Sequence, residues 1–248
     1  MPRAVLALAL AVAALVLAAC GGEGGAVAAG EGATLWVTRD RGAAVLVNER
    51  VPARGTVLQA LKRAARVKTR YGGRFVQAVN GLEGSLEGQH DWFYFVNGIE
   101  PDVGSAEVRV RAGDVVWWDF RSWRGRMAQP IVVGAFPEPF LHGWSGRRRP
   151  AQVRAPRGFE GEAKALLATL GGGEGEGEAD LFVLELRPGA HGAALTARRG
   201  AQNGSPVTFT LAGSREAVRA AARTLVQDPA AVRFRYQARF DERGEIVP

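Results

Sequence analysis

The stretch Trp92-Phe-Tyr-Phe-Val-Asn-Gly98 decides the fold of the first half of this chain. Four aromatic residues and one β-branched residue in a row favour a strand, and the Asn-Gly pair that follows is a strong signal for a tight turn. Successive side chains of a strand alternate between its faces, so Trp92 and Tyr94 lie opposite Phe93 and Phe95. A sheet that packs one face on a helix needs apolar side chains on that face only. Aromatic residues on both faces therefore predict that both faces are covered.

The segments around this strand predict one helix and several further strands. A capping box of Thr56 with Gln59 predicts the start of a helix whose apolar face follows helical spacing. The residues around this helix predict a hairpin at 34–38 and 44–48 with its turn at 40–42, further strands at 75–79 and 115–120, and a short edge strand at 107–110. The order of hairpin, helix and strands indicates an α+β protein that begins with a β-grasp, a mixed sheet wrapped on one helix, over residues 34–125.

The second half of the chain predicts a further small unit. Residues 126–156 are rich in Pro, Gly and Arg but contain too many apolar residues for a free linker, so we expect an ordered connection. Residues 157–248 then form a small α+β domain. Its predicted elements are a helix at 160–170, strands at 181–186 and 207–211, a helix capped by Ser214, and a last strand at 232–240.

The N-terminus carries the layout of a secretory signal. A short basic start is followed by an uncharged apolar run over residues 4–19. The sequence Leu17-Ala-Ala-Cys20 resembles the bacterial lipobox, which implies cleavage after residue 19 and a lipid anchor on Cys20. Cys20 is also the only cysteine of the chain. We expect residues 20–33 to be a flexible tether and the protein to be extracytoplasmic, anchored to the bacterial cell membrane. The alternative is an uncleaved anchor helix with an incidental cysteine.

Composition argues against several classes of function. The net charge is +7, but the one arginine run, residues 147–149, has no aromatic residues between its members, which disfavours nucleic-acid binding. The three histidines are isolated in the sequence, so no metal site is expected. Residues 143–147 do not form the nucleophile elbow of a hydrolase, because Arg147 stands where the pattern G-x-S-x-G requires its second glycine. Acidic residues between 174 and 180 suit a solvated loop better than calcium. We expect no catalytic residues, no cofactor and no enzyme.

Four motifs together resemble a known family. They are residues 56–61, 75–81, 92–98 and 113–120, and their order is that of the bacterial domain of unknown function 4430, which is related to the C-terminal domain of transcobalamin and intrinsic factor. The resemblance implies a β-grasp and an extracellular role. In the animal carriers such a domain contacts the corrinoid as one half of a clamp, and the helical barrel that forms the other half has no counterpart in this chain. Residues 133–143 also look like an element of actinobacterial lipoproteins that carry this domain.

The aromatic cluster is the candidate ligand site. Tyrosine and tryptophan combine apolar area with a polar group, and the residues selected on this ground are Trp92, Tyr94, Trp118 and Trp123. One hypothesis is a binding protein with a small apolar or corrinoid ligand, such as cobalamin, on this face. The other is an envelope structural or protein-interaction module, such as a transporter accessory, without a small-molecule ligand. In that case the aromatic residues pack against residues 131–144 or the C-terminal half.

Overall fold

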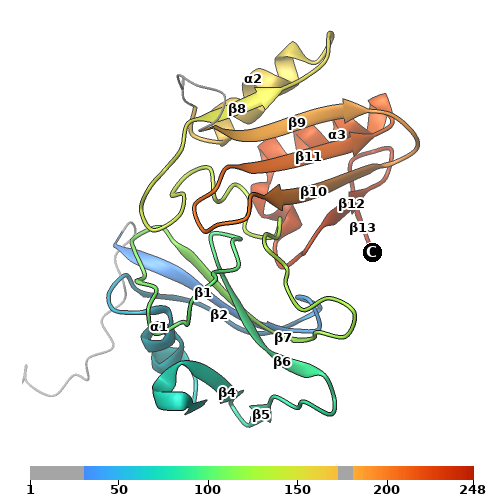
Figure 1. Ribbon diagram of the computed structural model, residues 1–248. Coiled ribbons are helices and arrows are strands. Elements are labelled where there is room, and N and C mark those ends of the chain that lie inside the picture. Colours follow the sequence, from blue (N-terminus) through green and yellow to red (C-terminus); the bar gives the residue numbers. More distant parts are fainter. Residues whose placement is uncertain (1–30, 173–180) are drawn as a thin grey trace, which may run out of the picture.

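The computed structural model describes residues 31–172 and 181–248 (Figure 1). Cys20, the predicted signal peptide, most of the tether and the acidic residues 174–180 lie outside the described residues. The described part combines three sheets with three α-helices, which confirms the α+β class. Within it, no helix has the length and apolar character needed to cross a membrane.

The first sheet has four strands in the order β2-β1-β7-β6. Its strands are β1 (Gly32–Arg39), β2 (Ala44–Pro52), β6 (His90–Val96) and β7 (Val115–Ser122). Strands β1 and β7 pair in parallel at the centre, and each pairs with its outer neighbour antiparallel. The predicted hairpin and its turn are thus present, and Asn97 adopts the positive φ that the turn after β6 requires.

A helix and a small sheet cover one face of this sheet (Figure 1). Helix α1 (Val57–Ala64) begins at the predicted capping box, with both reciprocal hydrogen bonds between Thr56 and Gln59. It packs Val57 and Leu61 into a core with Trp92 and Trp118. Behind it lie β3 (Val67–Arg70), a short 3-10 helix (Tyr71–Gly73), β4 (Phe75–Val79) and β5 (Leu82–Glu83).

The second half of the chain forms a six-stranded sheet in the order β13-β12-β10-β11-β9-β8. Its strands are β8 (Ala151–Arg154), β9 (Phe182–Pro188), β10 (Ala193–Arg199), β11 (Val207–Gly213), β12 (Ala238–Phe240) and β13 (Ile246–Val247). The helices are α2 (Glu160–Thr169), α3 (Arg215–Gln227) and the 3-10 turn Pro229–Val232. Helix α3 buries one alanine- and leucine-rich face in this core.

The other face of the first sheet is covered by the rest of the same chain. Trp36, Phe95 and Trp117 form a buried cluster with Val132 and Ala135 of the connection. Two aromatic residues of the C-terminal half close this cluster: Phe234 lies 4.8 Å from Trp36 and Tyr236 lies 5.5 Å from Trp117, between ring centroids. The expectation that both faces are covered is confirmed, and the cover comes from the connection and the C-terminal half.

Three predicted segments differ from the structure. Residues 107–110 form a turn with one isolated bridge instead of an edge strand, because the carbonyl of Val108 and the N–H of Val110 bond to the chain at the start of α1. Residues 151–154, which lie within the expected connection, form strand β8 beside β9. The last predicted strand, 232–240, is reduced to β12, because residues 233–237 leave the sheet and bury Phe234 and Tyr236 against the first sheet.

The ordered connection contains a titratable pair. Glu138, 4% exposed, accepts hydrogen bonds from the backbone N–H of His142 and from its Nδ1. The hydrogen bond to Glu138 raises the pKa of the half-exposed His142, while its partial burial opposes this rise. A raised histidine pKa stabilises the fold below the unfolded value of about 6.5, and this contribution disappears as the pH rises through the folded pKa.

The free energy of unfolding of the wild-type protein should exceed that of His142→Gln at pH 6. We therefore expect this excess to shrink by a small amount between pH 6 and pH 8. Glutamine keeps a donor near Glu138 but does not titrate in this range. Urea unfolding of both proteins across this window measures the difference in free energy of unfolding. A difference that is constant with pH would contradict the pairing.

Candidate anion-binding cleft

The structure brings together three of the four predicted ligand residues. Trp92 and Trp118 are 6% and 2% exposed and belong to the core with α1, and half-buried Tyr94 stacks on Trp118 with ring centroids 5.0 Å apart. The Tyr94 hydroxyl donates a hydrogen bond to the carbonyl of Val103, and burial raises its pKa, so it stays protonated. Trp123 lies beyond the end of β7 and does not line their pocket.

The pocket beside these residues is small. Trp92, Tyr94 and Trp118 line it together with Phe75 and Phe93, and its volume is about 190 Å³. Pockets for drug-sized ligands have volumes of about 300–1,000 Å³. This pocket is therefore too small to enclose a ligand of corrinoid size. Its notable polar feature is Trp118, whose buried Nε1 has no hydrogen-bond partner among the described residues.

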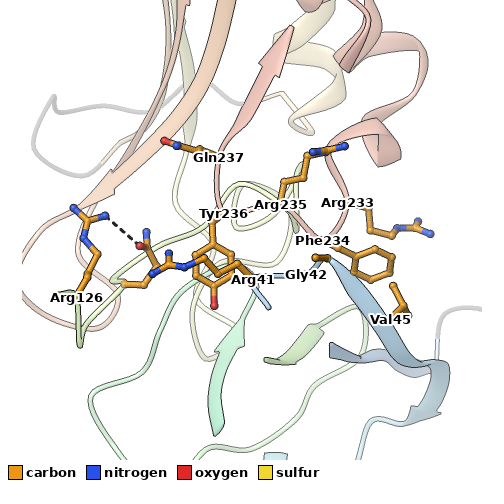
Figure 2. Close-up of a pocket in the computed structure, with 11 residues that line it drawn as sticks. Arg41, Gly42, Val45, Arg126, Arg233, Phe234, Arg235, Tyr236 and Gln237 are labelled. Carbon is orange, nitrogen blue, oxygen red and sulfur yellow. Dashed lines mark hydrogen bonds between the residues drawn. The ribbon is translucent and has the colours of Figure 1, made fainter. Parts of the chain in front are cut away.

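A wider cleft of about 610 Å³ lies between the two halves of the chain (Figure 2). Three segments form it: the turn between β1 and β2, the loop after β7, and residues 233–237. Its walls carry four arginines, and we call it the arginine cleft. The polar and aromatic lining comprises Arg41, Arg126, Arg233, Arg235, Gln129, Gln237, Phe234 and Tyr236.

The four guanidinium groups of the arginine cleft form no ion pair with any carboxylate in the described part of the chain. Arg41 lies over the ring of Tyr236 at 5.1 Å, and Arg233 lies over the ring of Trp36 at 5.4 Å. A guanidinium stacked on a ring keeps its N–H edge for a planar carboxylate or a phosphate. The arginine cleft thus has positive charge that no described carboxylate neutralises, and guanidinium donors that can bind an anion.

A buried carboxylate binds two of the segments that form the arginine cleft. Asp119 on β7 is fully buried and accepts four hydrogen bonds: 2.6 Å from the Thr38 hydroxyl, 3.1 Å from the N–H of Arg41, 3.2 Å from the N–H of Gly42, and 2.8 Å from the Tyr236 hydroxyl. Burial and the neighbouring Asp119 both raise the pKa of Tyr236, so its hydroxyl remains a donor. Asp119 therefore joins the turn that carries Arg41 to the C-terminal segment.

Gly42 allows this close approach of the two halves. Its φ is +85°, which favours glycine, and a Cβ at this position would lie 1.8 Å from the carbonyl oxygen of Phe234. No other residue fits there without moving the C-terminal segment. The turn and residues 233–237 are thus packed backbone to backbone at one side of the arginine cleft.

Sequence reasoning missed the arginine cleft because its members are far apart in the chain. The one arginine run of the sequence, residues 147–149, lies outside the arginine cleft. Arg148, for example, donates to the carbonyls of Phe140, Gly171 and Gly172. One local signal was available. Residues 233–236 read Arg-Phe-Arg-Tyr, in which basic and aromatic residues alternate.

The comparison with protein families identifies one region. Residues 55–122 match the family described as "Domain of unknown function (DUF4430)". The chain contains a DUF4430 domain. This confirms the predicted resemblance for that part of the chain, which includes α1, β6 and β7 together with Trp92, Tyr94 and Trp118. Asp119 lies inside the DUF4430 domain, whereas all four arginines of the cleft lie outside it.

Solved structures give distant similarities to this DUF4430-containing chain. A "putative metal binding protein" from Ruminococcus gnavus ATCC 29149 is 14% identical, covers 37% of this chain and 97% of its own, and has a TM-score of 0.31. Haptocorrin in complex with Cbi is 18% identical, covers 36% of this chain and 25% of its own, and has a TM-score of 0.30. No curated protein matches the chain. Within residues 31–172 and 181–248, no group of three His, Cys, Asp or Glu side chains is placed to hold a metal ion.

Proposed function

We propose that this protein is a lipid-anchored extracytoplasmic binding protein that holds an anionic ligand, or an acidic group of a partner, in the arginine cleft. The observation that carries the proposal is that four arginines, none of them ion-paired with a described carboxylate, line one cleft of about 610 Å³. The lipobox that ends at Cys20 supports the anchor. The order of β1, β2, α1 and the later strands supports a β-grasp over residues 34–125. We propose no catalytic role.

The chemistry of the arginine cleft favours carboxylates and phosphates. Hydrogen bonds from a guanidinium to either group are charge-assisted and frequently bidentate. Gln129 and Gln237 add neutral amide groups to the same cleft, and Phe234 and Tyr236 supply an apolar surface. The burial of Trp117 and Trp118 agrees with this proposal, because both are core residues. The arginine cleft, at about 610 Å³, is also larger than the aromatic pocket, at about 190 Å³.

Calorimetric titration of the full chain in nonionic detergent tests the ligand class, with pyrophosphate and citrate as probes. The test variant is Arg41→Gln/Arg233→Gln/Arg235→Gln. The matched control, Arg157→Gln/Lys164→Gln/Arg239→Gln, removes the same charge from exposed positions outside the cleft. We expect at least about a tenfold loss of affinity in the cleft variant, because charge-assisted hydrogen bonds contribute about 1.5–3 kcal/mol each. Equal losses in both variants would show that only net charge matters.

The anchor has an independent test. We expect cells that express the protein to incorporate an alkyne-labelled fatty acid into it, and Cys20→Ala to abolish the label. The variant should also leave the membrane fraction after processing or accumulate as an uncleaved precursor. Labelling that persists in Cys20→Ala would refute lipidation at this residue.

The aromatic pocket is a second candidate. The unpartnered Nε1 of Trp118 beside a hollow of about 190 Å³ favours a small, largely apolar ligand with one acceptor atom. Calorimetric titration with benzyl alcohol and with cobinamide tests this, and Trp118→Phe keeps a ring but removes the donor. Binding of benzyl alcohol that weakens in the variant would support this site. Cobinamide binding that needs Trp118 would instead support the corrinoid hypothesis.

A further inference from the structure

Strand β2 is the open edge of the first sheet. It is nine residues long and pairs with β1 on one side, and no described strand pairs with it on the other side. The backbone groups that face away from β1 form no backbone hydrogen bond with another described segment along residues 44–51. The register of β2 on β1 shifts at Leu46, so the regular part of this edge is residues 47–51. That part, with donors and acceptors unused by the described backbone, is a template for an added strand.

An exposed apolar side chain of this edge lies next to the arginine cleft. Val45 and Leu46 are 47% and 46% exposed, although both are aliphatic. Val45 also lines the arginine cleft, beside Arg41 and Phe234. Leu46 does not line the arginine cleft, so the exposed apolar side chain of this edge that adjoins its positive charge is Val45.

A second cleft follows the arginine cleft along β2. It has a volume of about 480 Å³ and is lined by residues 48–50 of β2, residues 134–138, residues 228–230 and Arg233. Its charged lining is mixed, with the carboxylates Glu49, Glu138 and Asp228 beside Arg50 and Arg233. Arg233 lines both clefts. The hollow beside β2 thus follows the strand for much of its length, with the arginines concentrated toward the end at Ala44.

We infer that the ligand of the arginine cleft is an extended acidic segment of a partner protein, which adds to the β2 edge as a strand. This inference rests on the proposed function and specifies its ligand. Backbone hydrogen bonds to β2 give the affinity, and carboxylates on alternate residues of the added strand reach Arg41, Arg233 and Arg235. Alternate residues are required because only every second side chain of a strand points to the same face. Charge complementarity at the Ala44 end of β2, where the four arginines lie and no described carboxylate lines the arginine cleft, therefore selects an acidic rather than a basic segment there.

Three peptides of eight residues test the inference, each titrated into the full chain in nonionic detergent. The first alternates Val or Thr with Glu. The second has the same side chains but carries N-methyl groups on the amides of one edge, which blocks pairing and preserves charge. The third replaces Glu by Gln. We expect the first peptide to bind, and both modified peptides to bind at least about tenfold more weakly. The variant Arg41→Gln/Arg233→Gln/Arg235→Gln should lose affinity for the first peptide to a similar extent.

Several results would overturn the inference. Equal affinity for the first and N-methylated peptides would mean that charge alone holds the segment. Binding of pyrophosphate without binding of any peptide would limit the arginine cleft to small anions, and the proposed function would survive. Binding of the first peptide only after removal of residues 1–30 would mean that the chain's own N-terminal segment occupies the edge. If neither pyrophosphate nor the first peptide binds, the proposed function is refuted as well.

Discussion

Replacement of Asp119 by alanine is expected to lower the free energy of unfolding by about 2–5 kcal/mol. The change removes the acceptor of four hydrogen bonds. Two of the donors, the hydroxyls of Thr38 and Tyr236, would stay buried or half-buried, and as a donor Thr38 would keep only the long hydrogen bond of 3.4 Å to the carbonyl of Trp118. Each unsatisfied buried group costs about 1–3 kcal/mol. The N–H groups of Arg41 and Gly42 lie nearer the surface and would recover part of their bonding from water. Urea unfolding followed by tryptophan fluorescence measures the loss.

Tyr236→Phe is the matched control for this prediction. It removes one of the four donors and keeps the ring against Trp117 and Phe95, so we expect a loss of about 1 kcal/mol. Asp119→Ala should also weaken pyrophosphate binding, because Arg41 and residues 233–237 would no longer be held together. An Asp119→Ala protein within about 0.5 kcal/mol of the wild type, the range of ordinary surface changes, would contradict the role assigned to this carboxylate.

Replacement of Arg121 by methionine is expected to cost about 3–5 kcal/mol, the range for removing one partner of a buried ion pair. Arg121 is fully buried and lies over the ring of Phe93 at 3.6 Å. Its guanidinium donates to the carbonyls of Arg126 and Met127 and to Glu100. The variant would release the loop after β7, which carries Arg126 and Gln129 into the arginine cleft.

Glu100 gives this prediction a pH dependence. Burial already raises the pKa of Glu100, and Arg121 opposes this rise. In Arg121→Met the pKa of Glu100 therefore rises further, so the variant should lose more stability at pH 8 than at pH 5.5. Adding Glu100→Gln should remove that pH dependence and restore part of the stability, because no carboxylate is then left buried without a partner. A loss that is independent of both pH and Glu100 would contradict this interpretation.

The sequence predicted the first half of the fold well, for local reasons. Thr56 and Gln59 satisfy each other's backbone partners within four residues. The pair Asn97-Gly98 signals its turn locally, although the buried Asn97 side chain also donates to Asp114 and to the carbonyl of Gly143. The predicted strand at 232–240 is present only at 238–240. Residues 233–237 have the alternating pattern of a strand, but the position of Phe234 and Tyr236 is decided by Trp36 and Trp117, about 120 to 200 residues earlier in the chain. Tertiary packing outweighed the local preference there.

The candidate site was less accessible to sequence reasoning. The aromatic residues of β6 and β7 stood out by type, but sequence could not show that Trp118 packs on α1 and Trp117 on residues 132–135. The arginines of the cleft are ordinary members of a basic chain until the fold brings Arg41 and Arg126 beside Arg233 and Arg235. What distinguishes them from the other arginines is that they line one cleft, and this property exists only in three dimensions.

The most direct test of the central claim is an NMR titration of the arginine Nε–Hε signals with pyrophosphate. The account predicts that the signals of Arg41, Arg233 and Arg235 shift together and saturate with one dissociation constant. The signals of Arg157 and Arg239, which lie outside the arginine cleft, should stay in place and serve as internal controls. Shifts of all arginine signals in proportion to the added anion, without saturation, would contradict an anion site in the arginine cleft.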